Sequence, residues 1–288
     1  MNGGSIMLPV QENITTIFTQ PIQTKPFVEV RRIMPHFQAV SLDEMQAYAL
    51  QDRVDTKYLI RLVDLPALLE KLLPTSRVLE VASQRINAYR TLYFDTPELS
   101  FYRDHHNGKR PRLKVRMRTY LSNGQSFLEV KKKENILRTS KIRMEIPSIT
   151  SDFSPTMAEF LMDCAVSSSM RLKAMLWNSF RRITLINIDS YERMTIDLGI
   201  DFHDGTSTLQ FPHLAVVELK QANFSRDSII VQSMKEKGYQ PVAFSKYCTW
   251  IATLNPTVKR NRFKQTFLQF RANTKRTFPN VNLIPVRA

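Results

Sequence analysis

The 288-residue chain has few of the residues that several common kinds of functional site require. Its seven glycines form neither a glycine-rich phosphate loop nor a dinucleotide-binding turn. Its two cysteines, Cys164 and Cys248, have no metal-binding or redox spacing, so we expect reduced and mostly buried thiols. It has no run of 18 apolar residues, and no basic N-terminal stretch is followed by a continuous apolar one. The sequence therefore predicts a cytoplasmic protein without a transmembrane helix or a signal peptide.

Negative charge is also scarce. The chain has 41 Lys and Arg against 26 Asp and Glu, which gives a formal net charge of +15 at pH 7. Its hydrophobic content of 43% is ordinary, and its length is enough to bury a substantial core in one or two domains. The positive charge implies an anionic partner, such as nucleic acid, acidic lipid, a nucleotide or polyphosphate. Charge alone does not choose among these.

The stretch from residue 255 to residue 288 contains no acidic residue at all. We expect it to begin as a helix, with Phe263, Phe267 and Phe270 on one face, and to end as a solvated basic tail. The alternative is that the tail docks on an acidic surface, such as a lipid or a membrane-associated partner subunit.

The most informative pattern lies between residues 109 and 141. Cations recur there at every second position, which in a β-strand places them on one face. These cations are Arg112, Lys114, Arg116 and Arg118. Such a row repels itself unless it is open to water or lies against an anion. We favour a cavity that holds a polyanion, because similar charge spacing recurs elsewhere.

Five other short strands alternate charged with apolar residues. An ordinary half-buried sheet explains any one of them, but a closed barrel with a polar interior explains them together. Its cations would bind phosphate oxygens, and a few carboxylates would hold a divalent metal. The sets that share a face are Arg53, Asp55 and Lys57; Glu129 and Lys131; Lys141, Arg143 and Glu145; Arg193, Thr195 and Asp197; and Glu218 and Lys220.

Periodicity and turn residues predict an α+β fold of about eight strands, mostly linked as antiparallel hairpins, with helices at the edges. Closing the sheet into a barrel would remove its edge strands. We expect a flexible leader over residues 1–35 and a single folded domain over residues 36–254. Strands are expected at residues 51–62, 87–94, 138–146, 180–189, 193–200 and 215–220 and in a hairpin around 122–124, and helices at 41–50, 64–73, 95–107, 151–178 and 225–238.

Six short motifs, taken in their order and spacing, resemble the polyphosphate polymerase domain of the vacuolar transporter chaperone (VTC) family. That domain belongs to the triphosphate tunnel, or CYTH-like, superfamily. The resemblance covers about three quarters of the chain. The motifs are YRTLYFDT at 89–96, RDHHNGKR at 103–110, KVRMRTY at 114–120, FLEVK at 127–131, VELK at 217–220 and FSKY at 244–247.

The resemblance implies a metal-dependent enzyme that transfers the γ-phosphoryl group of ATP to a growing polyphosphate chain inside a cationic tunnel. Mn²⁺ or Mg²⁺ would be its cofactor, ATP and polyphosphate its partners, and no nucleic acid is expected. By matching position, catalytic roles fall to Lys57, Arg116, Arg118 and Lys246, the last by orienting the acceptor phosphate. Further substrate contacts would come from Arg90 or Arg103, Arg182 or Arg193, and Lys114, Lys131, Lys141 and Lys220, and metal contacts from Glu218 and Glu129.

Two alternative functions stay open, a tunnel hydrolase that cleaves triphosphates and a non-catalytic polyanion or RNA binder. An Arg-x-Asp-x-Lys sequence at residues 53–57 replaces the Glu-x-Glu-x-Lys of the hydrolase branches, which favours a polymerase with fewer metal ligands. RNA modules expose aromatic rings among basic residues, whereas Tyr120 and Phe127 lie near a turn or alternate with apolar strand positions. No side-chain nucleophile is required, and His105 and His106 are expected in a polar turn.

Overall fold

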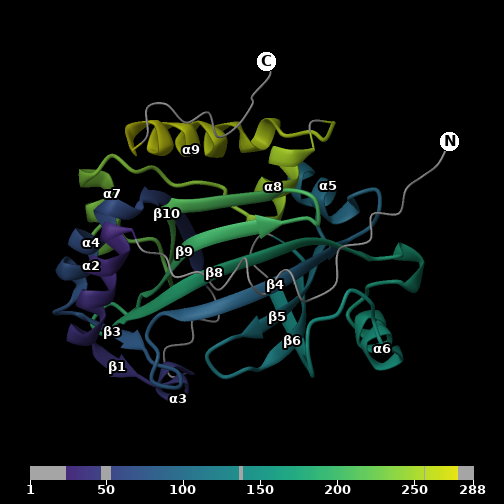
Figure 1. The fold of residues 1–288 in the computed structure, drawn as a ribbon, viewed down its shortest axis with the longest axis horizontal. Helices are drawn as coiled ribbons and strands as arrows, with labels where there is room; N and C mark the ends of the chain where they lie inside the picture. The colour runs from purple at the N-terminus through teal and green to yellow at the C-terminus, as the bar shows by residue number, and fades with distance from the viewer. Residues whose placement is uncertain (1–23, 47–52, 136–138, 256, 278–288) are drawn as a thin grey trace.

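The structure is a computed structural model that describes residues 24–46, 53–135, 139–255 and 257–277. A large, mostly antiparallel sheet dominates this part of the chain (Figure 1). Its strands are β1 (Gln38–Val40), β2 (Val54–Arg61), β3 (Ser76–Leu79), β4 (Asn87–Asp95), β5 (Arg112–Tyr120), β6 (Ser126–Lys133), β7 (Thr139–Ile146), β8 (Lys173–Asn187), β9 (Arg193–His203) and β10 (Thr208–Gln221).

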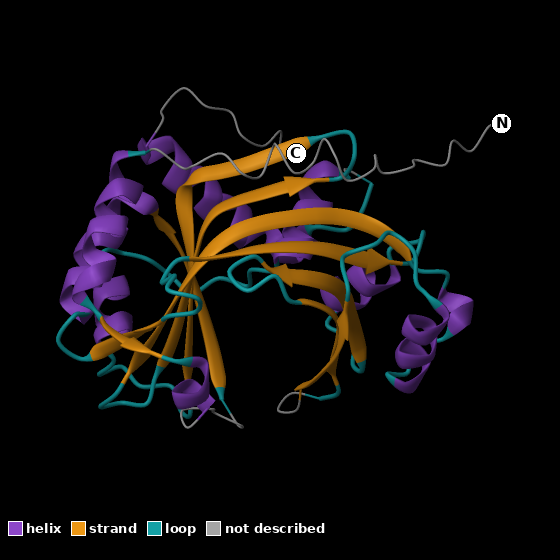
Figure 2. Ribbon diagram, turned by 60° about the horizontal axis from the view of Figure 1, so that its bottom comes forward, coloured by secondary structure: helices purple, strands orange, loops and turns teal. Residues whose placement is uncertain are grey.

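Eight of the strands lie side by side in the order β2-β10-β9-β8-β4-β5-β6-β7, and each neighbouring pair is antiparallel. Short strand β3 pairs with β8, and β1 pairs with β3 in parallel. The sheet bends strongly, so that its strands curve around its concave side (Figure 2). The bend turns the strand faces that carry alternating charges toward one another.

Helices and short 3-10 turns pack against the sheet. The α-helices are α2 (Lys25–Ile33), α3 (Leu42–Gln46), α4 (Leu65–Leu72), α5 (Ser100–Asn107), α6 (Pro155–Asp163), α7 (Ile229–Glu236), α8 (Lys246–Leu254) and α9 (Lys264–Thr277). The 3-10 turns are Met34–His36, Leu62–Asp64, Ser168–Met170 and Asn261–Phe263. No helix in the described ranges combines the length and the apolar character needed to cross a membrane.

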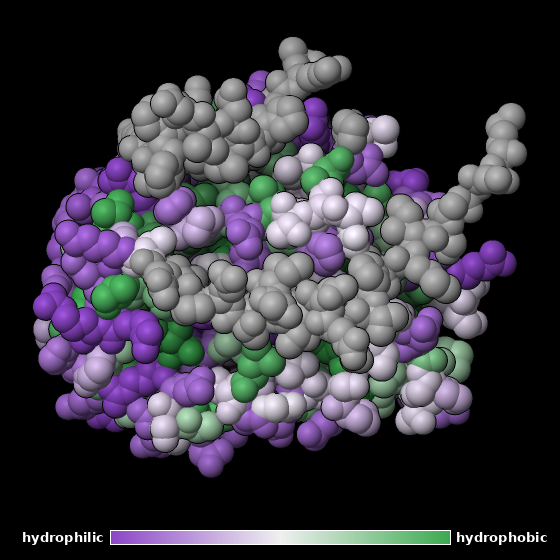
Figure 3. Space-filling view, viewed as in Figure 1, coloured by the Kyte–Doolittle hydropathy of each residue, from purple (hydrophilic) through white to green (hydrophobic). Residues whose placement is uncertain are grey.

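Most of the apolar core lies between helices and the convex face of the sheet, where one cluster joins α2, α4 and α7 to the central strands. A second cluster instead packs α8 and α9 against the concave face at one end of the sheet, since its Leu59, Phe180 and Val216 share strand faces with the concave residues Lys57, Arg182 and Glu218. A third places Met157 and Leu161 of α6 near Val115 and Met117 of β5, both of which are fully buried. Hydrophilic side chains cover the outer side of α2, α4 and α7 (Figure 3, left). Because apolar residues fill the convex side, the charged residues of the same strands are left on the concave side.

The predicted antiparallel α+β fold is confirmed, with two differences. The sheet has ten strands, because β1 and β3 are too short to give a visible alternation in the sequence. Within the described residues it does not close, since β2 and β7 are its two edges and do not pair with each other. The predicted tunnel is therefore an open, strongly curved sheet rather than a sealed barrel.

Four local predictions differ from the structure. The predicted leader is wrong over residues 25–35, since α2 buries Phe27, Val30 and Ile33 at helical spacing in the core. The predicted helix at 151–178 ends early, and β8 begins at Lys173. Ser228, not Ser225, caps α7. Asp64 makes no capping hydrogen bond to α4 because Arg61 and Tyr239 donate to its carboxylate. Residues 1–23 and 278–288 lie outside the described residues.

Other local signals behave as expected. Ser41 and Glu44 form the predicted capping box, in which each side chain accepts a hydrogen bond from the other residue's backbone N–H. Both cysteines are free and buried. The aromatic face of the C-terminal helix is confirmed, because Phe263, Phe267 and Phe270 are buried.

Candidate functional site

The concave face of the sheet encloses a cavity of about 470 Å³. Side chains from β2 and from β5 to β10 line it, together with the start of α8. Within the described part of the chain, twelve cations and four carboxylates line this cavity, an excess of eight positive charges. The cations are Arg53, Lys57, Arg112, Lys114, Arg116, Arg118, Lys131, Lys133, Lys141, Arg182, Lys220 and Lys246, and the carboxylates are Asp55, Glu129, Asp197 and Glu218.

Eleven of the fourteen residues predicted for the site line this cavity. The other three lie elsewhere. Arg90 points to the convex face, where its guanidinium lies 4.5 Å from the centre of the Trp177 ring. Arg103, on α5, lines a smaller cavity with Pro97 and Lys259. Arg193 lines another cavity, further along the concave face.

The wall formed by β5, β6 and β7 carries most of the unpaired cations. Among the described residues that line the cavity, Glu129 is the one carboxylate of this wall, is 1% exposed and forms ion pairs with Arg116, at 2.6 Å, and with Lys141. Burial by itself would raise the pKa of Glu129, but the charges of Arg116, Arg118 and Lys141 outweigh burial and lower it. Glu129 is therefore ionised and acts as the counterion of this wall.

Arg118 has no carboxylate partner of its own on this wall. It is buried, donates a hydrogen bond of 3.0 Å to Thr91 Oγ1, and lies 5.5 Å from the Tyr89 and Phe180 ring centres. Burial, followed by repulsion from Arg116, lowers its pKa. Burial likewise lowers the pKa of Lys114, and the pKa of Lys131 falls to about 8 because of burial and the nearby charges of Lys114 and Lys57. These shifts mark a site that favours an added anion.

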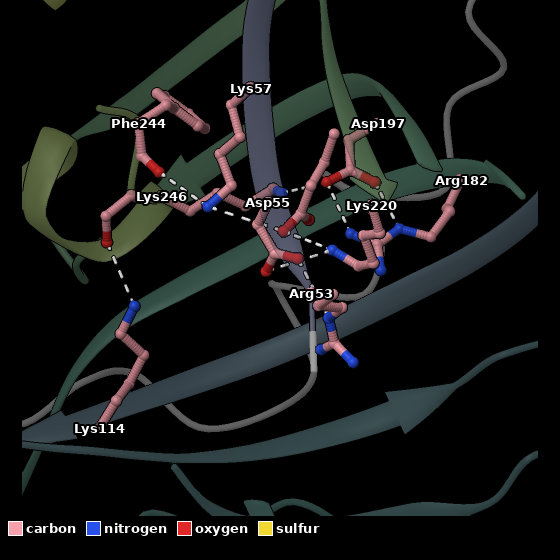
Figure 4. A network of polar contacts seen from close by, with 11 residues as sticks. Arg53, Asp55, Lys57, Lys114, Arg182, Asp197, Lys220, Phe244 and Lys246 are labelled. Carbon is pink, nitrogen blue, oxygen red and sulfur yellow. Dashed lines mark hydrogen bonds and ion pairs between the residues drawn. The ribbon is translucent and has the colours of Figure 1, made fainter. Parts of the chain in front are cut away.

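The opposite wall, formed by β2 and β8 to β10, has its charges paired. Arg182 donates two hydrogen bonds to Asp197, of 2.6 and 2.8 Å, and Lys246 forms an ion pair with the same carboxylate (Figure 4). Lys246 also lies 4.3 Å from the Phe180 ring centre. Burial opposes ionisation of Asp197, but the charges of Arg182 and Lys246 prevail and lower its pKa to about 2. Asp197 thus fixes two cations at the cavity surface.

Glu218 lies on the same wall, on β10, and Asp55 lies diagonally opposite on the neighbouring strand β2. Lys220 contacts Glu218 at 2.6 Å and Asp55 at 3.7 Å, and Lys57 lies 3.8 Å from Glu218 (Figure 4). Burial would raise the pKa of Glu218, but the charges of Lys57 and Lys220 lower it. Two carboxylates therefore share one ammonium group.

The start of α8 closes one end of the cavity. Lys114 donates a 3.2 Å hydrogen bond to Ser245 Oγ, which also caps the helix, and Lys57 donates one of 3.4 Å to the Phe244 carbonyl. Tyr247 donates a 2.6 Å hydrogen bond to Asp95, which is fully buried. These contacts to Phe244, Ser245 and Tyr247, which surround Lys246 in the chain, fix the backbone position of Lys246.

Asp95 also organises α5. The residue before that helix, Leu99, has a left-handed backbone and no capping side chain. Asp95 instead accepts hydrogen bonds of 2.8 and 3.0 Å from the backbone N–H groups of Phe101 and Tyr102 in the first turn. The buried carboxylate thus ties β4, α5 and α8 together, and this role was not predicted although both motifs were noticed.

The sequence reasoning missed further residues of the cavity. His105 lies on α5 and lines the cavity, so the prediction of a turn residue is wrong. Burial and the charges of Lys114 and Arg112 lower the pKa of His105 to about 3. Asp197 was recognised as facing the interior but was given no role. Arg112, Arg53 and Asp55 were likewise recognised on charged strand faces but were given no role. Period-two extension of β6 indicates Lys133, whereas nothing in the pattern indicates Tyr93 as a site residue.

The surroundings of the cavity's carboxylates indicate which of them could bind a divalent metal. In the described ranges, no cluster of three or more His, Cys, Asp or Glu side chains could hold an ion. Cations contact Glu129 at both carboxylate oxygens, so the expectation that it ligates a metal is not supported by its surroundings. Glu218 fits better, because its two ion pairs both involve Oε1 and Mg²⁺ in phosphate-transferring sites needs only one or two carboxylates besides phosphate oxygens and water.

A family model described as the VTC domain matches residues 52–255, which is more than half of the chain. The chain therefore belongs to the VTC domain family, as its motifs predicted. A search of the curated proteins finds no match.

Several solved structures are similar in fold. One is a Hippeastrum protein described as a candidate adenylyl cyclase with a dominant triphosphatase activity (14% identity, TM-score 0.44, 70% of this chain and 95% of that one). Another is a candidate adenylate cyclase of Bacillus halodurans (14% identity, TM-score 0.42, 74% and 97%). At these scores the likeness gives no grounds for inferring an activity.

Proposed function

We propose that the protein is an ATP-dependent polyphosphate polymerase that transfers the γ-phosphoryl group of ATP to a growing polyphosphate chain. The observation that carries this proposal is the excess of cations over carboxylates in the cavity. A compact anion such as a carboxylate cannot neutralise cations that are spread over six strands, but a linear phosphate chain can contact many of them. Membership of the VTC domain family supports the same substrate class.

The proposed reaction needs little covalent help from the protein. An ionised terminal oxygen of the acceptor chain attacks the γ-phosphorus in line, the bond to the bridging β–γ oxygen breaks, and ADP leaves with that oxygen. Charge is conserved in this exchange, so no proton has to move. Arg116 and Arg118 would stabilise charge on the transferring group, while Lys246 would orient the acceptor.

A divalent metal would be held by Glu218 together with phosphate oxygens of the substrate. Bound there, Mg²⁺ or Mn²⁺ would neutralise charge on the triphosphate. Lys220 and Lys57, which now contact Glu218, would be free to turn to phosphate oxygens instead.

A tunnel triphosphatase is the second candidate, because one observation favours it. His105 lines the cavity and, with its pKa lowered to about 3, is neutral at physiological pH and can accept a hydrogen bond from water. The same low pKa makes it a weak base, which disfavours activation of water for hydrolysis. We therefore place the polymerase first.

The test is incubation of the purified protein with ATP and Mn²⁺ or Mg²⁺, followed by a gel stained for polyphosphate and quantification of ADP. The proposal predicts long phosphate chains in amounts that match ADP. Orthophosphate without chains would instead establish the triphosphatase, and no turnover with either metal would leave a polyanion-binding protein.

A further inference from the structure

Along β5 and β6, the side chains on the concave face change from cationic to aromatic. On β5, the alternating cations end at Arg118, and the next residue on that face is Tyr120. On β6, Lys131 and Glu129 are followed on the same face by Phe127, which pairs directly with Arg118. The wall of the cationic cavity therefore continues without interruption into an aromatic one.

This aromatic stretch forms part of a second cavity, of about 390 Å³. Three of its rings contact one another, with Tyr120 lying 5.1 Å from Tyr89 and 5.8 Å from Phe127, edge to face in both cases. The cavity is lined from β3, β4, β9, the β5–β6 hairpin, β7 and α3. Its polar lining includes the amides Asn87, Asn123 and Gln125 and the side chains of Asp43, Gln46, Ser122, Arg143 and Arg193.

Two guanidinium groups reach this second cavity from opposite sides of the curved sheet. Arg143 of β7 lies 4.5 Å from the centre of the Phe127 ring. Arg193 of β9 has a buried Nε atom without a hydrogen-bond partner in the described residues. A buried donor without a partner is costly, so this atom points to an acceptor that the protein itself does not provide. Between the two cavities, Arg118 lies against Tyr89.

We propose that the second cavity binds the base and ribose of a nucleoside triphosphate whose phosphates extend past Tyr89 to Arg118 and Arg116. A nucleobase has a π-face that stacks on aromatic rings and polar edges that amides and hydroxyls can contact, whereas a phosphate chain has neither. Arg193 and Arg143 then contact the ribose and the first phosphate. This inference rests on the proposed function and specifies where its donor lies.

The assignment gives the cavity a direction. With the nucleoside at the aromatic end, the γ-phosphorus falls among Arg116, Arg118 and Glu129, in the middle of the concave face. The acceptor chain then occupies the cationic end near Lys131 and Lys246 and leaves there, while ADP leaves at the aromatic end. Donor and polymer do not compete for the same opening.

The first experiment compares Tyr120→Ala, Tyr120→Phe and the wild type by calorimetric binding of a non-hydrolysable ATP analogue and of tripolyphosphate, each with Mg²⁺. Tyr120→Ala should weaken binding of the ATP analogue by about tenfold or more and leave tripolyphosphate binding unchanged. Tyr120→Phe, which keeps the ring, should bind both like the wild type. Phe224→Ala removes an exposed ring that lines neither cavity and serves as the control.

A second measurement does not depend on how well a variant folds. The wild type is photolabelled with 8-azido-ATP, and the labelled peptide is identified. Label in the β5–β6 hairpin or near Tyr89 is expected, and label in α8 near Lys246 would overturn the inference, as would equal loss of both ligands in Tyr120→Ala. If the wild type binds tripolyphosphate but not the ATP analogue, the inference fails while a phosphate-binding cavity stands, and binding of neither ligand overturns the proposed function as well.

Discussion

The two walls of the cationic cavity both carry cations and carboxylates, but in different proportions. On the wall formed by β5 to β7, seven of the described lining residues are cations, and Glu129 is the one carboxylate among them. On the wall formed by β2 and β8 to β10, counting Arg53 just before β2 and Lys246 at the start of α8, five lining cations face three carboxylates. The first wall therefore has far more positive charge left for a ligand than the second.

This difference teaches that a charged cavity can be divided into a part that binds and a part that positions. Ion pairs on the second wall, such as Arg182 with Asp197, hold cations at fixed places and lower the cost of burying them. Cations on the first wall, such as Arg118 and Lys114, remain under mutual repulsion, which an incoming anion relieves. Breaking an ion pair on the second wall should therefore mainly lower stability, whereas removing a cation from the first wall should mainly lower activity.

The largest effect is expected on the paired wall. Asp197→Asn leaves Arg182 and Lys246 buried without their counterion and should lower the free energy of unfolding by about 3–5 kcal/mol. Chemical denaturation measures this loss. Added tripolyphosphate should stabilise the variant more than the wild type, because it replaces the missing charge, and equal stabilisation would contradict the division between the walls.

Activity should suffer most on the unpaired wall. Arg116→Ala should raise the barrier to phosphoryl transfer by about 2–4 kcal/mol, which lowers kcat/KM by about two to three orders of magnitude. Because the change also leaves Glu129 with fewer partners, the double variant Arg116→Ala/Glu129→Gln controls for folding. Lys132→Ala, on the opposite face of β6, should keep full activity. A folded Arg116→Ala enzyme with wild-type turnover would exclude this wall from the reaction.

Glu218→Gln tests the one position on the paired wall that we assign to a metal. The metal concentration needed for half-maximal activity should rise by about tenfold or more, with a smaller effect on stability. Activity is titrated with Mn²⁺ and Mg²⁺, and denaturation is measured in parallel. An unchanged metal titration would remove Glu218 as a ligand.

The smallest effect concerns pH. Partial burial, then the charges of Lys114 and Lys57, lower the pKa of Lys131 to about 8, while Glu218 and Asp55 oppose the shift. A bound anion favours protonated Lys131, so affinity for tripolyphosphate should fall as pH rises from 7 to 9, by at most about tenfold from this group. Lys131→Arg should show a shallower decline in calorimetric titrations, and an identical decline would assign the titration to other lysines. Lys132→Arg is the matched control.

Much of the fold followed from the sequence because it depends on local patterns. Alternation along β5 and β6 predicted the hairpin and its charged face, and the Ser41–Glu44 spacing predicted a capping box. Helix α2 was missed because its apolar residues are few and lie among prolines and charges, and their burial depends on distant helices. Local composition does not record such long-range packing.

The site was predictable to the extent that side-chain direction follows strand period. Arg116 and Lys131 were found that way, but the same period could not reveal that Asp197 joins Arg182 to Lys246, since the three residues come from β8, β9 and α8. Arg90 shows the opposite limit. Its motif suggested a substrate contact, yet its place in the alternation of β4 puts it against Trp177 on the convex face.

The most direct test of the central claim follows the phosphorus atoms themselves. The wild type is supplied with ATP, Mn²⁺ or Mg²⁺ and a short polyphosphate primer, and ³¹P NMR spectra are recorded as ATP is consumed. Growth of the signal from internal chain phosphates, in step with ADP, is the predicted result. Consumption of ATP with only orthophosphate appearing would contradict the account, because the cavity would then pass the phosphoryl group to water.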